Sequence, residues 1–184
     1  MPDTEHDRND ILKLHKDWWE ANAGLDIPRM KSVFPSGMSY LMFNLNGHPY
    51  FGIDEKTRLW EWYQEQLDIQ MPDIRIMRLT ISGDMAWLAC EGVFPLRLIG
   101  QSGTGSQTWK VGEAGEAAYD PFRLRATELY QRDDGTGQPI WKMWHFHCSP
   151  LPPANEPRPC FGDTAQERGL GWIPDGQPER VVGV

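Results

Sequence analysis

Helical patterns occupy the first third of this chain and strand patterns most of the rest, which restricts the fold class before any motif is considered. Residues 7–25 place apolar side chains at steps of three and four, which predicts an amphipathic helix. A short helix at residues 26–34 should follow, because Asp26 is a suitable N-cap and Pro28 suits a first turn. A third helix is expected at residues 54–68, with an apolar stripe of Leu59, Trp60, Tyr63 and Leu67.

Strand-type runs dominate the sequence after the third predicted helix. Residues 73–82 and 85–99 flank Gly83 and Asp84, which is a hairpin signal. The other predicted strands are residues 38–46, which end in an Asn46-Gly47 turn, and residues 121–132 and 140–149, which flank a turn at 133–137. Helices followed by antiparallel strands are typical of the α+β class, with a curved sheet wrapped around the N-terminal helices.

The domain organisation predicted from the sequence is one folded unit at residues 1–150 with two extensions. A chain of 184 residues fits one domain of this kind. Residues 100–118 are rich in glycine, serine and glutamine, which predicts a long mobile loop. Residues 151–184 contain many prolines and glycines and little periodicity, so they should form an extended arm.

Composition and missing motifs exclude several classes of function. The net charge of −8 comes without a basic stripe, which argues against a nucleic-acid partner. No apolar run approaches the roughly 18 residues of a membrane span, and the acidic start does not resemble a signal peptide, so a cytoplasmic protein is expected. Three widely spaced cysteines indicate reduced thiols. The only close pair of metal ligands is His145 and His147, and neither a metal nor a cofactor is expected.

The last predicted strand carries the most unusual side chains. Because strand side chains alternate, Trp141, Met143, His145 and His147 should share one face. The two histidines are then either satisfied core or interface residues or acid–base groups in a cavity, where desolvation shifts an imidazole pKa. The opposite face, with Trp144, Phe146 and Cys148, should pack against the helices.

Other candidate site residues lie on the remaining strands. Glu91 interrupts an apolar run, so it is either ion-paired or a general base, and Arg78 or Arg125 could supply the cation. Tyr40 and Asn44 share strand parity and could orient a substrate oxygen. Nine tryptophans exceed what a small core usually uses, which favours an aromatic, planar substrate.

The order and spacing of these motifs resemble the SnoaL-like branch of the NTF2-like superfamily (nuclear transport factor 2). The resemblance covers residues 8–150, and its matching residues are Trp18, Trp19, Asp26, 51–55, Trp60, 83–87, 125–127, Trp141 and 145–149. It implies a cone-shaped α+β barrel with an apolar cavity, and a homo-oligomer (dimer or trimer) formed through the sheet. The loop at 100–118 and the tail at 151–184 exceed the compact family pattern. Cys148 stands where the association domain of calmodulin-dependent kinase has an arginine.

The superfamily includes ketosteroid isomerases, scytalone dehydratase, polyketide cyclases, limonene epoxide hydrolase and lyases that release formaldehyde from lignin-derived diaryl compounds. The resemblance does not fix a reaction. The leading hypothesis is a cofactor-independent acid–base enzyme (lyase, dehydratase or isomerase). The tryptophan count favours a bulky aromatic substrate, with formaldehyde loss from a diaryl compound as one option. The predicted catalytic residues are His147, Glu91, Arg125 and Tyr40. The predicted substrate-binding residues are His145, Asn44, Arg78, Trp18, Trp60, Trp87, Trp141 and Tyr50. The alternatives are a non-catalytic ligand-binding or assembly module and the small subunit of an aromatic-ring dioxygenase.

Overall fold

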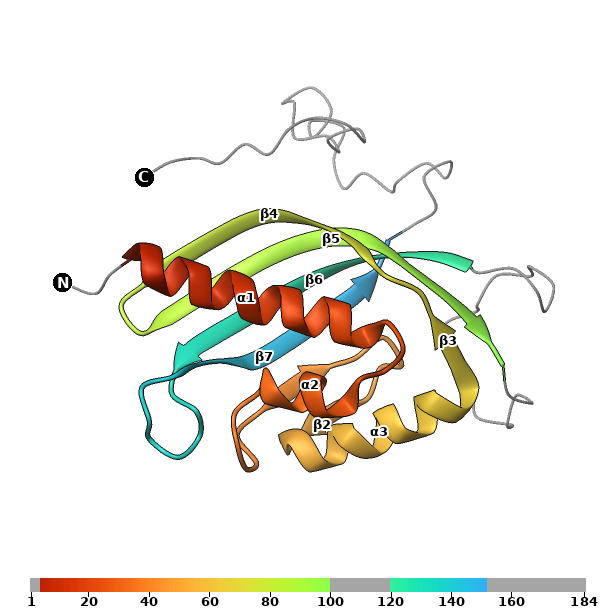
Figure 1. Ribbon diagram of the computed structural model, residues 1–184, viewed down its shortest axis with the longest axis horizontal. Helices are drawn as coiled ribbons and strands as arrows, with labels where there is room; N and C mark the ends of the chain where they lie inside the picture. Colours follow the sequence, from red (N-terminus) through yellow and green to blue (C-terminus); the bar gives the residue numbers. More distant parts are fainter. Residues whose placement is uncertain (1–3, 100–119, 152–184) are drawn as a thin grey trace, which may run out of the picture.

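The computed structural model describes residues 4–99 and 120–151 of the chain (Figure 1). The predicted loop at 100–118 and the predicted arm after residue 151 lie outside these residues. The helices are α1 (Thr4–Asn22), α2 (Ile27–Ser32) and α3 (Gly52–Gln66). The strands are β1 (Leu41–Phe43), β2 (Pro49–Phe51), β3 (Leu67–Ile69), β4 (Asp73–Ser82), β5 (Met85–Leu98), β6 (Asp120–Arg132) and β7 (Trp141–Pro150).

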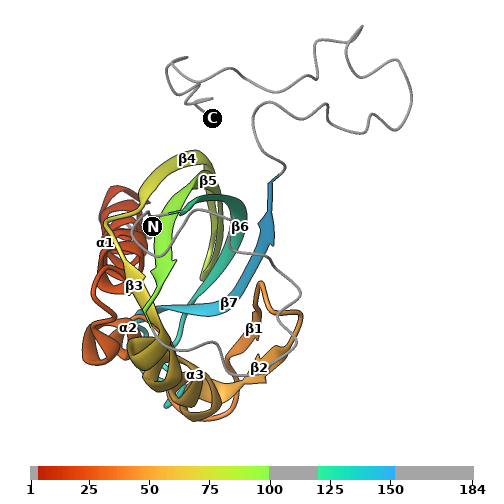
Figure 2. The same cartoon turned by 90° about the vertical axis from the view of Figure 1, so that its right-hand side faces the viewer.

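One curved sheet holds all seven described strands in the order β2-β1-β7-β6-β5-β3, with β4 paired to the first part of β5. Every pairing is antiparallel except that of β1 with β7. The sheet curls into a half-barrel, with α1 against its concave side (Figure 2). The predicted α+β fold, a curved sheet wrapped around N-terminal helices, is confirmed. Within the described ranges, no helix is long and apolar enough to cross a membrane.

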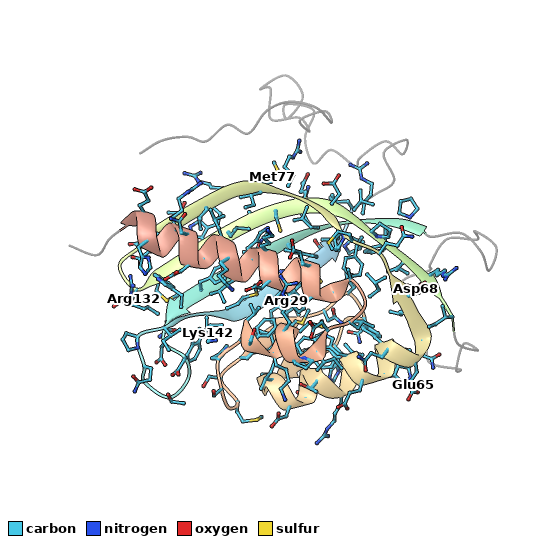
Figure 3. The ribbon with its side chains drawn as sticks, in the orientation of Figure 1. Arg29, Glu65, Asp68, Met77, Arg132 and Lys142 are labelled. Atoms are coloured by element: carbon cyan, nitrogen blue, oxygen red, sulfur yellow. The ribbon has the colours of Figure 1, made fainter. Side chains whose placement is uncertain are left out.

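Local sequence signals account for the boundaries of the first two helices. Gly24 adopts a left-handed φ of 73° just after α1, where a residue without a Cβ fits best. The carboxylate of Asp26 accepts a hydrogen bond from the backbone N–H of Arg29 at 3.2 Å, so the predicted N-cap is confirmed. Arg29 also bridges α2 to α1 by ion pairs with Asp17 and Glu20 (Figure 3).

Tertiary pairing changes two predicted elements. The strand predicted at 38–46 shortens to β1, which pairs for three residues with β2 and β7. Leu67, predicted to belong to the third helix, instead begins β3 and pairs with Leu98 of β5. An apolar residue at the end of a helix pattern has no local reason to change conformation, so the pairing with a distant strand decides this boundary.

An aromatic cluster joins the helices to the sheet. The Trp18 ring of α1 lies 5.8 Å from Trp60 of α3, 5.3 Å from Phe146 of β7 and 5.1 Å from Phe34, between ring centres. Several of these contacts are edge-to-face, a geometry that adds roughly 0.5–1.5 kcal/mol per pair beyond burial. The cluster therefore holds α1 and α3 in a fixed position over the concave face.

A buried carboxylate lies beneath α1 in the same core. Glu128 of β6 has no exposed surface, and it accepts hydrogen bonds from Trp19 Nε1 at 2.8 Å and from the hydroxyl of Tyr130. His15 Nδ1 lies 2.9 and 3.1 Å from the two carboxylate oxygens, so the tautomer with a proton on Nδ1 completes the network. Burial raises the pKa of Tyr130 well above its ordinary value, which keeps this hydroxyl a donor.

A second polar contact anchors the start of α1. The guanidinium of Arg132 donates two hydrogen bonds of 2.6 Å to the Asp7 carboxylate, which also accepts a bond from Trp141 Nε1 at 3.0 Å. The hydrogen bonds from Arg132 hold the pKa of Asp7 below its usual value. Arg132 lies at the end of the sheet near the first turn of α1 (Figure 3). The hydrogen bond from Trp141 to Asp7 therefore joins β7 to α1.

Candidate active site

An apolar pocket lies between α1, α3 and the concave face of the sheet. Its volume is about 60 Å³. Aromatic rings form much of the wall, contributed by Trp18, Trp19, Trp60, Tyr63, Phe94 and Phe146. The other lining residues are Asn22, Met42, Asn44, Leu45, Lys56, Leu67, Ile69, Leu96, Leu124 and Cys148. No aspartate, glutamate or histidine of the described chain lines this pocket, so its polar chemistry depends on a few other groups.

Lys56 is positioned in the pocket wall by the way α3 begins. Gly52 has a φ of 73°, and a Cβ added there would lie 2.9 Å from the Met38 sulfur and 3.0 Å from the Gly37 carbonyl oxygen. Its backbone N–H donates to the carbonyl of Tyr40 at 2.8 Å. Starting from this point, helical spacing of three and four places Ile53, Lys56 and Trp60 on the buried face.

The Lys56 ammonium group lacks the anionic partner that a buried lysine ordinarily has. The residue is 1 % exposed, and no described residue forms a hydrogen bond or ion pair with it. Its Nζ instead lies over two ring faces, 4.7 Å from the centre of Tyr50 and 5.7 Å from that of Trp60. Burial lowers the pKa of Lys56 to about 7, so the free amine is well populated at neutral pH.

The neighbouring polar groups of the wall are neutral. The Asn44 amide donates to the Tyr63 hydroxyl at 3.4 Å, and the Cys148 thiol lies 4.0 Å from the Asn44 carbonyl oxygen. Burial raises the pKa of Cys148 to about 12 and also raises the pKa of Tyr63. Both groups therefore remain protonated near pH 7 and offer hydrogen bonds, and Lys56 is the pocket's proton acceptor.

No family model and no curated protein matches the sequence significantly. Solved structures nevertheless share its architecture. A ketosteroid isomerase-like protein from Erwinia carotovora atroseptica is 14% identical, with a TM-score of 0.59 over 79% of this chain and 96% of that one. A candidate dehydratase of the NTF2-like family from Streptomyces avermitilis is 16% identical, with a TM-score of 0.58 over 83% and 100%. The chain has the NTF2-like fold. An uncharacterised protein with a cystatin-like fold from Caulobacter vibrioides agrees, at 15% identity and a TM-score of 0.56 over 89% and 96%.

A bulge in β7 overturns the predicted faces of this strand in the NTF2-like sheet. Leu129 pairs with His145 whereas Tyr130 pairs with Met143, so Trp144 is an extra residue. Beyond this bulge, the alternation of inward and outward side chains along β7 is shifted by one residue. Trp141 and Met143 are buried before the bulge, and Phe146 and Cys148 are buried after it. The prediction that Trp141, Met143, His145 and His147 share one face is therefore wrong, as is the inward position predicted for Trp144. The predicted position of Phe146 and Cys148 on the helix side of the sheet is confirmed.

His145 and His147 lie together on the face of the sheet away from the pocket. Both rings make edge contacts with Phe43, at 5.3 and 5.7 Å, and His147 is exposed. His145 Nδ1 bonds the Leu41 carbonyl at 3.0 Å, and burial lowers the pKa of His145. The bulge thus separates both histidines from the cavity. A homo-oligomer formed through this sheet stays a prediction.

Glu91 and Arg125 also lie outside the pocket lining, as a cross-strand ion pair. They are directly opposite each other on β5 and β6, and Arg125 Nη2 donates to Glu91 Oε1 at 2.8 Å. The ion-pair interpretation of Glu91 is confirmed, with Arg125 as the cation. Arg78 instead stacks over the exposed Trp87 ring, 5.6 Å from its centre. Neither catalysis by Glu91 nor substrate binding by Trp87 and Arg78 has support from these positions.

Replacing Glu91 with glutamine should change the free energy of unfolding by less than about 1 kcal/mol, because half of the Arg125 side chain is exposed and screened by solvent. Urea denaturation of both proteins measures this difference. A loss above about 2 kcal/mol would contradict the expected solvent screening of the Arg125 side of the pair.

The other predicted site residues divide between the pocket and the core. Trp18, Trp60 and Asn44 line the pocket, and Tyr50 lies beneath Lys56. Tyr40, predicted to be catalytic, is fully buried against Phe34 at 4.3 Å and does not reach the lining, and its hydroxyl has no hydrogen-bond partner within the described ranges. Trp141, predicted to bind substrate, instead bonds Asp7 far from the pocket.

Sequence reasoning missed Lys56, although a signal for it was present. Lys56 precedes Trp60 by four residues and Tyr63 by seven, which is the spacing of the apolar stripe of the third helix. A lysine within such a stripe is either extended to the surface or buried with a function. Its position next to residues of α1, β1 and β7 appears only in the folded chain.

One cluster of the described residues has the ligand types of a metal site. Ligand atoms of His15, Cys90 and Glu128 lie within 4.8 Å of one another, although these residues are far apart in the sequence. Four donors already surround the Glu128 carboxylate, including the Cys90 thiol at 3.8 Å. Burial raises the pKa of Cys90, which disfavours the thiolate that a metal requires. The cluster is better explained as a satisfied structural network.

Proposed function

We propose that this chain is a cofactor-independent enzyme that uses the Lys56 amine to transfer a proton on a small molecule with an aromatic group. The observation that supports it is a lysine in an apolar pocket without an anionic partner among the described residues. Such a lysine costs stability, because its charged form is poorly solvated. A chain that retains it at a pocket wall has the kind of perturbed group that acid–base catalysis requires.

The pocket wall supports the proposed substrate class. Ring faces and edges favour contact with a planar apolar group. The volume of about 60 Å³ is less than half of the roughly 150 Å³ cavity in which an engineered protein holds benzene. We therefore expect the reactive end of the substrate to enter next to Lys56, with any larger aryl group extending towards the pocket mouth or widening the pocket.

The groups near Lys56 have distinct roles in the proposed reaction. The neutral amine accepts a proton from carbon or oxygen and returns it to the product. Asn44 and Tyr63 supply hydrogen bonds to a substrate oxygen on which negative charge develops. Elimination of water, isomerisation and carbon–carbon cleavage all fit these roles. Loss of formaldehyde from a lignin-type diaryl compound is one concrete case.

The test uses a lignin-type diarylpropane diol and an aryl β-hydroxyketone, with release of formaldehyde or water-elimination products measured for each. Lys56→Met should lower kcat/KM by about 10²-fold or more, whereas Glu91→Gln and His147→Ala should leave it unchanged. Activity of the parent protein should rise with pH through about 7, as Lys56 loses its proton. Full turnover by Lys56→Met would refute the proposal. It would also be refuted if the parent protein turned over none of the compounds and none of them changed its tryptophan fluorescence.

A further inference from the structure

We propose that the Lys56 amine also forms a covalent imine with small aldehydes and ketones that enter the pocket. This inference rests on the proposed function, since it uses the same amine and the same cavity. It goes further by making Lys56 a nucleophile and by naming carbonyl compounds as the ligand class. Three features of the pocket carry it: the available nucleophiles, the surroundings of the positive charge, and the size of the cavity.

The choice of nucleophile follows from the residues in the wall. Cys148 is the other nucleophilic side chain there, and its thiol is held protonated by burial, with a pKa of about 12. No carboxylate or imidazole of the described chain lines the pocket. A desolvated lysine amine is the type of group that attacks a carbonyl carbon. Lys56 therefore provides the electron pair for any covalent step in this cavity.

The step balances without a redox partner. The Nζ lone pair forms a C–N bond to the carbonyl carbon. The carbonyl oxygen takes one proton from the amine nitrogen and one from solvent, its C–O bonds break, and it leaves as water. The product is a protonated imine, which has one positive charge like the ammonium form of Lys56. The ring faces of Tyr50 and Trp60, 4.7 and 5.7 Å from Nζ, can stabilise that charge where no carboxylate does.

Cavity size restricts which carbonyl compounds react readily. About 60 Å³ accommodates a carbonyl group with a few carbon atoms. Propanal should therefore react without any change of the wall, whereas benzaldehyde requires the pocket to widen. At equal concentration, we therefore expect propanal to react with Lys56 faster than benzaldehyde does.

The experiment treats the full chain with propanal and sodium cyanoborohydride, which reduces the imine to a stable amine. Intact mass should increase by the mass of the aldehyde less one oxygen, and peptide mapping should place the group on Lys56. At pH 7 an ordinary lysine is neutral in roughly one molecule in 2,500, so labelling of Lys56 should be at least about tenfold faster than that of exposed Lys13. Lys142→Arg, at a partly buried lysine bonded to the Ser32 carbonyl, is the matched control, and its Lys56 should label as in the parent.

Lys56→Arg and Lys56→Met should both lose this rapid labelling, because neither side chain forms an imine. Using two variants guards against failure of one to fold, which circular dichroism checks. Labelling of Lys56 no faster than that of Lys13 would overturn the inference. If Lys56→Met loses turnover but the parent traps no aldehyde, the proposed function stands and the imine does not. If aldehyde labels Lys56 while turnover is unaffected by Lys56→Met, the imine stands and the proposed function does not.

Discussion

Lys56→Met is expected to raise the free energy of unfolding by roughly 3–5 kcal/mol at neutral and lower pH, while removing the working amine. Folding lowers the pKa of Lys56 from 10.5 to about 7, and each pKa unit corresponds to about 1.4 kcal/mol. Methionine fills similar space without a charge. A substitution that increases stability and removes activity is the signature of a side chain kept for function.

The pH dependence of this effect has a definite sign. Between pH 7 and 10.5 the unfolded chain binds the Lys56 proton and the folded chain does not, so stability of the parent protein rises with pH in this window. The advantage of Lys56→Met should therefore be largest below about pH 7 and should vanish towards pH 10.5. Urea denaturation of both proteins across this range measures the difference, in which the other titrating groups cancel.

Lys31→Met is the matched control for Lys56→Met. Lys31 lies on the surface of α2, 3.7 Å from an exposed Asp54 carboxylate, so its replacement should change stability by less than about 1 kcal/mol. A Lys56→Met protein that is less stable than the parent at pH 6, or whose difference from the parent does not change with pH, would show that Lys56 is not desolvated as described.

Glu128→Ala is expected to lower the free energy of unfolding by about 3–5 kcal/mol. The substitution leaves His15, Trp19 and Tyr130 without their acceptor in a region closed to solvent. It also creates a cavity beneath α1. This loss is a large fraction of the 5–15 kcal/mol by which a domain is typically stable, so the variant should unfold at much lower urea concentration.

Glu128→Gln provides a milder test of the same network, because it retains one carbonyl acceptor and should lose less stability than Glu128→Ala. Glu91→Gln, at a carboxylate paired with the half-exposed Arg125, is the control for the chemical change itself. If Glu128→Gln were as harmless as Glu91→Gln, the hydrogen bonds to Glu128 would contribute little, and the cluster with Cys90 would need another explanation.

Much of the fold could be predicted because its signals are local. Asp26 and Pro28 mark the start of α2, and Gly83 lies between β4 and β5 with a φ of 60°, as a tight turn requires. The limits of β4 agree with the predicted residues 73–82. The errors occur where pairing between distant segments determines the conformation. Leu67, for example, fits the helix pattern but instead lies in β3 and pairs with β5.

The candidate site was predicted much less well, and β7 shows why. A bulge depends on how β7 pairs with β6, so the sequence alternation carried no mark of the extra residue Trp144. One extra residue places His145 and His147 on the outer face, whereas Phe146 and Cys148 lie on the helix side as predicted. Trp18 and Trp60 line the pocket because their helices keep the predicted spacing, whereas Asn44 lines it from just beyond the shortened β1.

The sequence by itself determined the α+β class and the order of helices and strands, since periodicity and turn residues act over a few neighbouring positions. Only the tertiary structure decided which side chains meet. Lys56 loses its water because Trp60 on its own helix, Trp18 on α1 and Phe146 on β7 enclose the same small cavity. Desolvation is a property of all these segments together, and it is what lowers the pKa of Lys56 and makes this amine the one we propose as reactive.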